Sequence, residues 1–167
     1  MSDEKQARAG CAPGDFRDVI GHFATGVTIV TAREADVDFG VTVSAISSLS
    51  LEPPMLLVCL NRESRTQGVI SRTGAFAVNI LESGQADLAR LFATSRDDKF
   101  SEVELARGDL GHPLLAGALA HVECEVDEEA TGGTHAVFLA KVRRAVRYDG
   151  EPLLYYRGQL GWAGAEA

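Results

Sequence analysis

Hydroxyl-bearing side chains gather in one short stretch where they could hold a small polar ligand. TVSAISSLSLEPPMLLVCL, residues 42–60, ends in a continuous apolar run but begins with four serines: Ser44, Ser47, Ser48 and Ser50. A strand followed by a turn rich in serine hydroxyls and free backbone N–H groups can surround the edge of a flat heterocycle or a phosphate. The alternative is an irregular connection before Pro53 that binds nothing, because serine is a common turn former.

A second set of polar residues follows at once. CLNRESRT places four of them between the end of the apolar run and an expected helix start: Asn61, Ser64, Arg65 and Thr66. The backbone N–H groups of a helix start and nearby hydroxyls can together bind an anion. Arg65 has a second interpretation, as a solvated surface charge. The two sets together favour a ligand site over a plain connection.

Signatures of catalysis by the protein's own side chains are missing. The chain has no G-x-G-x-x-G, G-x-x-x-x-G-K, H-E-x-x-H or G-x-S-x-G pattern. The histidines are scattered without an i, i+4 pair, so we expect no metal site from them: His22, His112, His121 and His135. Hydrolysis is not excluded by distance in sequence, yet no nucleophile and base are marked. There remains chemistry carried by a cofactor, which the protein positions and tunes.

The elements that must position these residues are mostly strands. Within residues 13–26, apolar residues at spacings of three and four predict a short amphipathic helix: Phe16, Val19, Ile20 and Phe23. β-Branched residues predict a strand at 26–32, with a hairpin partner at 38–46. The same reasoning predicts further strands and two more helices. The strands are expected at 54–60, 75–81, 121–129, 134–148 and 152–158, and the helices at 64–74 and 85–95.

Six or seven strands against three short helices indicate a mostly β, α+β fold. The connections are hairpins without regular strand–helix alternation, which favours an antiparallel barrel over a doubly wound sheet. Residues 97–120 are rich in glycine and weakly periodic. We expect them to form a long ordered loop over a site, because loops of that length in compact domains are usually functional or disordered.

Composition limits the partners and the compartment. The 167 residues are 46% hydrophobic, enough for one core, so we expect a single domain at 14–167 after a flexible tail at 1–13. A net charge of -8 argues against nucleic acid and anionic membranes as partners. Three widely spaced cysteines and no apolar run of about 20 residues predict a cytoplasmic protein without disulfides or membrane spans.

Six motifs in a fixed order carry a family resemblance. FATGVTIVTA, GVTVSAISSLSLEPPMLLVCLNRES, FAVNIL, KF, GTHAVF and PLLYYRG resemble the short-chain flavin reductases that serve two-component monooxygenases, the family of the 4-hydroxyphenylacetate 3-monooxygenase reductase components. The resemblance covers roughly residues 15–162. It implies an FMN-binding split β-barrel, and a homodimer with flavin near the subunit interface. Members of this family pass a hydride from NADH, less often NADPH, to FAD or FMN and release the reduced flavin to a partner oxygenase.

The resemblance also implies which residues meet the flavin. The flat ring system would be bordered by Thr42, Val43, Ser44, Ala45 and Ser48. The path toward the phosphate would follow Cys59, Leu60, Asn61 and Ser64. Two more pairs match the family, one near the flavin tail and one on the strand that closes the pocket: Lys99 with Phe100, and Tyr156 with Arg157.

One position departs from the family pattern. The histidine of the Gly-x-His signature falls on His135, in or beside the nicotinamide site, but Thr134 stands where many members have Asp. Threonine lacks the carboxylate that could fix the imidazole, which leaves the role of His135 and the choice of NADH over NADPH open. Two rival functions also stay open. One is a pyridoxamine-phosphate oxidase-like enzyme with tightly held FMN, and the other is a non-catalytic flavin- or haem-binding module.

Overall fold

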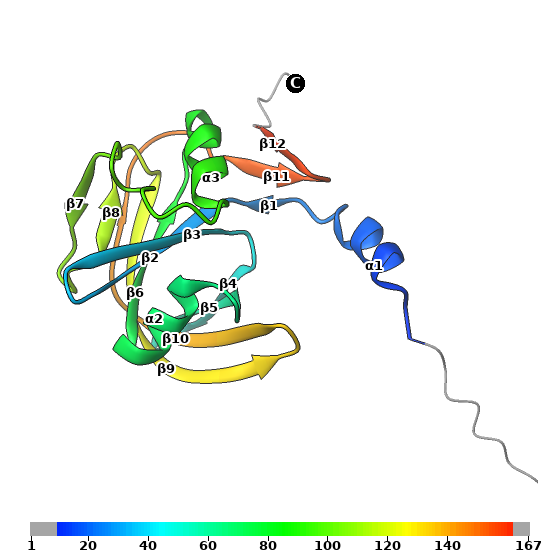
Figure 1. Ribbon diagram of the computed structural model, residues 1–167, viewed down its shortest axis with the longest axis horizontal. Helices are drawn as coiled ribbons and strands as arrows, with labels where there is room; N and C mark the ends of the chain where they lie inside the picture. The colour runs from blue at the N-terminus through cyan, green and yellow to red at the C-terminus, as the bar shows by residue number, and fades with distance from the viewer. Residues whose placement is uncertain (1–9, 162–167) are drawn as a thin grey trace, which may run out of the picture.

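The computed structural model describes residues 10–161 and is built around one antiparallel sheet (Figure 1). Its seven strands follow the order β3-β2-β6-β9-β10-β5-β4. Their bounds are β2 Thr28–Glu34, β3 Val37–Val43, β4 Ile46–Leu51, β5 Pro54–Asn61, β6 Ala75–Ile80, β9 Ala120–Gly132 and β10 His135–Arg147. Because only Ser44 and Ala45 join the two end strands β3 and β4, the sheet must curl back on itself. The predicted mostly β, barrel-like fold is confirmed.

Two smaller sheets and a few helices complete the fold. The first small sheet has the order β1-β11-β12, with β1 Thr25–Gly26, β11 Leu154–Tyr156 and β12 Gln159–Gly161. The second pairs β7 Leu105–Arg107 with β8 Pro113–Leu115. The helices are α1 Pro13–Ile20, α2 Arg65–Thr73, α3 Ala86–Phe92 and the single-turn 3-10 helix η1 Ser83–Gln85. The three predicted α-helices are therefore present in the predicted places.

Two hydrophobic cores lie on opposite faces of β2. Its alternate residues Val30 and Ala32 join the cluster inside the barrel, with Phe76 and Phe138. Ile29 faces the other way, into a second cluster that contains Phe92 and Leu115. Burial on both faces explains why this strand is a continuous run of β-branched and small residues.

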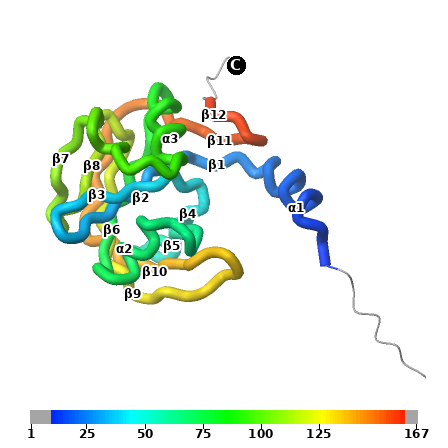
Figure 2. The backbone as a smooth tube through the Cα atoms, in the orientation of Figure 1, coloured from blue at the N-terminus to red at the C-terminus, as the bar shows by residue number. Residues whose placement is uncertain are grey.

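Helix α1 stands away from the barrel (Figures 1 and 2). None of its residues is buried, and its apolar side and the segment behind it are exposed: Phe16 58%, Val19 72%, Ile20 50% and Phe23 70%. The backbone N–H of Arg157 donates to the carbonyl of Gly21 at 3.1 Å, and His22 meets the ring of Tyr156 edge-on. The predicted amphipathic helix thus exists but ends at Ile20, and its apolar face stays largely exposed within residues 10–161.

Two predictions about irregular segments were wrong. Ser47, Ser48 and Ser50, expected in a turn, lie on β4, which pairs with β5 along one side and forms an edge of the sheet, while Ser44 lies in the short connection before it. The stretch 97–120, expected to be a loop, contains the β7–β8 hairpin. Short, glycine-flanked strands of three residues leave too little alternation to be recognised in a sequence. No helix of the described residues is both long and apolar enough to cross a membrane.

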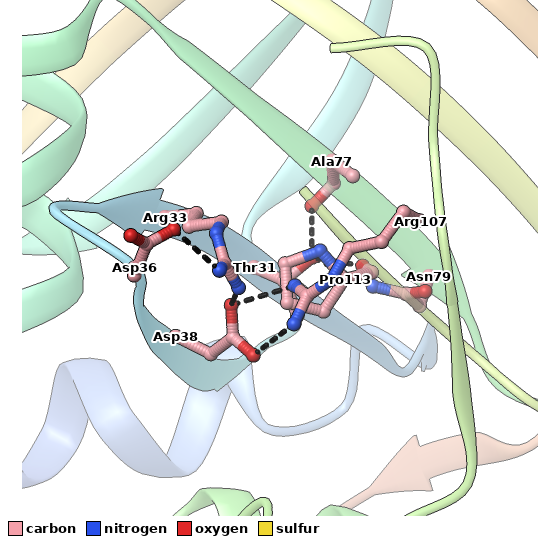
Figure 3. Close-up of polar contacts among 8 residues, drawn as sticks. All are labelled: Thr31, Arg33, Asp36, Asp38, Ala77, Asn79, Arg107 and Pro113. Atoms are coloured by element: carbon pink, nitrogen blue, oxygen red, sulfur yellow. Dashed lines mark hydrogen bonds and ion pairs between the residues drawn. The ribbon is translucent and has the colours of Figure 1, made fainter. Parts of the chain in front are cut away.

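Buried polar contacts hold the β7–β8 hairpin against the barrel. The hydroxyl of Thr31 donates to the carbonyl of Pro113 at 2.6 Å, next to the amide of Asn79 (Figure 3). Asn79 donates to Ile29 O at 3.0 Å and accepts from the N–H of Leu115 at 2.8 Å. Because all these groups are buried, losing one partner would leave the other unsatisfied. The hairpin is therefore a fixed part of the fold.

The hairpin also covers two titratable groups. Glu123, an acidic residue of β9, is 1% exposed and accepts a hydrogen bond from the N–H of Leu110 at 2.8 Å. His112 is 4% exposed, and its ring nitrogens have no hydrogen-bond partner among residues 10–161. Burial lowers the pKa of His112, although the nearby carboxylates of Glu123 and Asp38 act in the opposite direction.

Candidate functional site

Three adjoining cavities follow strand β3 across the molecule. The α2 cavity, of about 660 Å³, is lined by residues 37–41, 61, 63–66, 93–97, 99 and 100. The α3 cavity, of about 530 Å³, is lined by Val27, Thr42, Ser44, Ala89, Arg90, Ala93, Tyr155 and 158–160. The α1 cavity, of about 690 Å³, is lined by Arg17, Asp18, Ile20, Gly21, Phe23, Thr25, 44–47, Leu57, Cys59, Tyr155, Arg157 and Gly158. Ala93 is shared by the first two cavities, and Ser44, Tyr155 and Gly158 by the last two, so neighbouring cavities adjoin; the row of three is called the groove below.

The α2 cavity offers hydrogen-bond donors at a helix start. The side chain of Ser64, the residue before α2, makes no capping bond to the helix and remains available. The side-chain oxygen of Asn61 accepts from the N–H of Glu63 at 2.9 Å, which fixes the orientation of this amide. The first N–H groups of a helix have no partner within it and carry partial positive charge. This end of the groove is suited to an anionic group.

Lys99 and Phe100 form the opposite wall of the α2 cavity. Lys99 is buried, and its ammonium donates to the carbonyls of Gly40 and Phe92, each at 3.2 Å. Burial, with a smaller contribution from the charge of Arg65, lowers the pKa of Lys99. The ring of Phe100 meets Phe92 edge-on, with 5.0 Å between centroids. Lys99 therefore brings positive charge to the cavity while also joining β3 to the end of α3.

Backbone and small side chains dominate the middle of the groove. The hydroxyl of Thr42 donates to Ala89 O at 2.6 Å, so it serves the packing of α3 on β3. Ser44 is exposed and faces both the α3 and the α1 cavity. Ala45 accepts the N–H of Cys59 at 2.9 Å through its carbonyl. This part of the groove can hold a flat ring with few committed polar side chains.

The α1 cavity lies where helix α1 approaches the sheet. Burial raises the pKa of the half-buried Cys59 thiol, which stays neutral near pH 7. Arg157, with φ +48°, and Gly158, with φ +82°, form the two-residue turn between β11 and β12. Positive φ at both positions is typical of the tight hairpin turns that match strand twist. The turn places Arg157 among the residues that line the cavity, next to Gly21 at the end of α1.

His135 lies beside this groove at the start of β10. It pairs with Asn61 across the sheet, which brings it next to the α2 cavity, although it is not among the residues that line the three cavities. The hydroxyl oxygen of Thr134 lies 2.9 Å from its Nδ1. Thr134 therefore supplies an orienting contact through a hydroxyl at the position where many members of the family that the sequence resembles have a carboxylate.

The remaining candidate residues divide by burial. The side chains of Val43 and Leu60 point into the barrel core, so only their backbone can reach a ligand. Ser48 is exposed on the edge strand β4 and lines none of the three cavities. Tyr156 is 46% exposed and contacts His22 with its ring. Sequence reasoning missed Tyr155, although its neighbours Tyr156 and Arg157 had been selected; alternation along the strand was the available signal.

The outer face of β5 and β10 is apolar and only partly covered. Leu57 and Cys59 lie opposite Leu139 and Val137 in the ladder, on the face that points away from the barrel core. The α1 cavity opens onto this face at Leu57 and Cys59. Within residues 10–161, no group of three or more His, Cys, Asp or Glu side chains could hold a metal ion.

Known proteins with these features are flavin reductases. The flavin reductase like domain matches residues 20–164 of this chain. The reductase component of the 4-nitrophenol 4-monooxygenase/4-nitrocatechol 2-monooxygenase from Rhodococcus opacus is 48% identical over 147 residues, which cover 88% of this chain and 79% of that protein. The NADH-dependent FAD reductase from Streptomyces globisporus is 37% identical over 148 residues, covering 86% of this chain and 81% of that protein.

Solved structures of flavin reductases are also similar to this chain. The NADH:FAD oxidoreductase from Streptomyces globisporus, in complex with NAD and FAD fragments, superposes with a TM-score of 0.88 at 35% identity, covering 95% of this chain and 99% of that chain. The styrene monooxygenase flavin reductase from Pseudomonas putida has a TM-score of 0.84 at 27% identity, covering 91% and 99%. Because the family's domain matches residues 20–164, most of the chain, this protein belongs to the flavin reductase like domain family.

Proposed function

We propose that this protein is an NADH-dependent flavin reductase that supplies reduced FAD or FMN to a partner monooxygenase. The observation that carries the proposal is the row of three adjoining cavities from the start of α2, past Thr42 and Ser44, to Cys59. Its anion-binding end and its flatter, less polar middle suit a phosphate joined to a planar ring. The relatives named as NADH-dependent FAD reductase and as monooxygenase reductase component support the same substrates and partner.

The phosphate is proposed to bind at the start of α2, and the ring system farther along β3. Ser64, Asn61 and Lys99 would hold the phosphate end, with Phe100 beside them. The ring would lie along the backbone from Thr42 to Ala45, with Ser48 farther out on β4. Cys59 and Leu60 would contribute backbone groups, and Arg157 would close the far end, with Tyr156 beside it at the end of β11 although Tyr156 lines none of the three cavities.

The main catalytic task of this site would be to align the nicotinamide with the flavin ring. Flavin and nicotinamide supply the hydride chemistry themselves when bound, so no side chain must donate a proton in that step. Backbone N–H groups near Ser44 and Ala45 would hold the polar edge of the ring and stabilise negative charge there. His135, oriented by Thr134, would hold the nicotinamide end of NADH by a hydrogen bond.

The protein is proposed to act as a homodimer in the cytoplasm. Leu57, Cys59, Val137 and Leu139 form an apolar outer sheet face that one copy leaves partly exposed. Continuous apolar runs such as those of β5 and β10 are typical of strands buried on both faces. A second copy would cover this face and bring the flavin site close to the interface. The cysteines of the described residues are free, which suits a reducing compartment.

NADH consumption at 340 nm with FAD, FMN and riboflavin in turn tests the function. A flavin reductase oxidises NADH only when flavin is added, and it loses flavin on dialysis. A protein that stays yellow through dialysis would instead indicate the oxidase alternative. Absence of turnover with every flavin, at saturating NADH, would contradict an enzymatic role and favour a binding module.

A further inference from the structure

One wall of the α2 cavity has no regular secondary structure. After α3 ends at Phe92, residues 93–104 form turns and bends until β7 begins at Leu105. Seven residues of this segment, Ala93 to Asp97, Lys99 and Phe100, line the cavity. A wall without a backbone ladder keeps its position only through contacts to neighbouring elements. Those contacts therefore decide the shape of the cavity.

Three hydrogen-bonded contacts tie this wall and the elements on either side of it to strand β3, at every second residue; the segment also pairs with α2 through Asp97 and Arg65 and packs on the second core through Phe100. Thr42 bonds to α3 through Ala89 O at 2.6 Å, and Gly40 O accepts from Lys99 at 3.2 Å. Asp38 accepts from Arg107, the last residue of β7. Alternate residues of a strand share one face, so positions 38, 40 and 42 present a single surface to the segment. The Asp38 contact holds the end of the segment that lies beyond Phe100.

Of these three contacts, the one made by Asp38 is bidentate and joins opposite charges (Figure 3). Its two oxygens accept from Nη1 and Nη2 of Arg107, both at 2.7 Å, and Oδ1 also accepts from Arg33 at 2.9 Å. The side chain is 14% exposed. Burial alone would raise the pKa of Asp38, but the hydrogen bonds from Arg107 and Arg33 outweigh it and lower the pKa. The paired, partly buried geometry distinguishes this contact from an ordinary surface ion pair.

Asp36 provides a contrast within the same hairpin. It accepts one hydrogen bond from Arg33 at 2.8 Å, across the turn between β2 and β3, and its side chain is 95% exposed. It joins residues that the hairpin already holds together. Asp38, in contrast, joins β3 to a segment that lies 69 residues later in the chain.

The geometry points to Asp38 as a positioning residue for flavin binding. By holding Arg107, it fixes β7, and through the four residues between Phe100 and β7 it fixes the wall that carries Lys99 and Phe100. Although Asp38 lines the cavity, its carboxylate is occupied by two guanidinium groups and does not itself bind the ligand. The inference rests on the proposed flavin reductase function, because it assigns the α2 cavity to the phosphate end of the flavin.

Three variants test it: Asp38→Asn, Arg107→Met and the control Asp36→Asn. The first two are expected to raise the KM for FMN by about five- to tenfold, while the KM for NADH and kcat change by less than about twofold. The control is expected to leave all three constants within about twofold of the parent protein. Asp38→Asn and Arg107→Met remove the same contact. The double variant should therefore raise the KM for FMN no more than either single variant does. Hydrogen exchange in residues 93–100 should be faster in both.

Several results would overturn the inference. One is an equal effect of Asp38→Asn and Asp36→Asn on the KM for FMN. Another is a parallel rise of the KM values for FMN and NADH with a lower Tm, which a merely structural role predicts. Unchanged hydrogen exchange in residues 93–100 would also contradict it. If the parent protein oxidised no NADH with any flavin, the proposed function would fail, but the exchange measurement would still decide whether Asp38 fixes the wall.

Discussion

Gly40 is the position where β3 passes beneath two aromatic rings. A Cβ atom built on it would lie 2.6 Å from Cε1 and 2.8 Å from Cδ1 of Phe92, and 3.0 Å from Cζ of Phe100. Favourable carbon–carbon contacts begin at about 3.5 Å, so a methyl group does not fit. Phe92 is fully buried in the second core and cannot turn toward solvent. Either α3 or β3 must therefore move to admit a methyl group.

We expect Gly40→Ala to lower the free energy of unfolding by about 1–3 kcal/mol, the usual cost of overpacking a core. Because the carbonyl of Gly40 also accepts from Lys99, the shift should reach the α2 cavity and raise the KM for FMN. Urea unfolding followed by circular dichroism, at one fixed protein concentration, measures the first effect. Steady-state kinetics with varied FMN measures the second.

Gly68→Ala is the matched control, and we expect it to raise the free energy of unfolding rather than lower it. Gly68 lies inside α2, where the nearest atom to an added Cβ would be Nη1 of Arg72, the mobile end of a long side chain, at 3.3 Å. Alanine is preferred over glycine in a helix interior by about 1 kcal/mol, so this variant should be more stable. If Gly40→Ala lowered the free energy of unfolding by less than about 0.5 kcal/mol, the close approach of β3 to Phe92 would be refuted.

Four further outcomes are expected. Ser64→Ala should raise the KM for FMN by about tenfold and leave that for riboflavin unchanged, because only FMN carries the phosphate; equal effects would remove Ser64 from the phosphate site. His135→Ala should raise the KM for NADH by roughly tenfold with flavin affinity within about twofold, whereas a parallel loss with a lower Tm would show a structural histidine. Leu139→Glu should yield a 17.8 kDa monomer by light scattering, and an unchanged dimer would exclude the outer face as the interface. Since burial lowers the pKa of His112, the stability that its neutral form contributes should be fully present above about pH 6.5 and fall as the pH drops below that value. Urea unfolding at pH 7.5 and 5.5 measures this loss of stability. His112→Leu should make the loss smaller, and the control His22→Leu should leave it unchanged.

The sequence predicted the regular elements well because their patterns are local. The hairpin of β2 and β3 and the three helices all follow from periodicity and turn residues. The position of Ser47, Ser48 and Ser50 on β4 could not be predicted, since pairing with β5 comes from the rest of the sheet. Local pattern is also insufficient for α1: its apolar spacing predicts a face that packs on something, but it does not identify the packing partner.

For the site, sequence resemblance selected residues near the groove but not their roles. Ser64, Asn61, Lys99 and Phe100 do come together around one cavity. The resemblance could not distinguish side chains that face the groove from Val43 and Leu60, which face the core. Nor could it reveal Asp38 and Arg107, because their contact joins segments far apart in the chain and neither belongs to a motif.

The internal hydrogen bonds of the groove have a kinetic consequence. Thr42, Asn61 and Lys99 already donate to or accept from protein groups, so a bound flavin gains few new side-chain bonds from them. Modest affinity follows, and with association near 10⁶–10⁷ M⁻¹s⁻¹ a roughly micromolar Kd corresponds to dissociation at about 1–10 per second. A product that leaves within about a second is suited to delivery by diffusion. The rate at which a second enzyme captures it would then govern how much reduced flavin is lost to oxygen on the way.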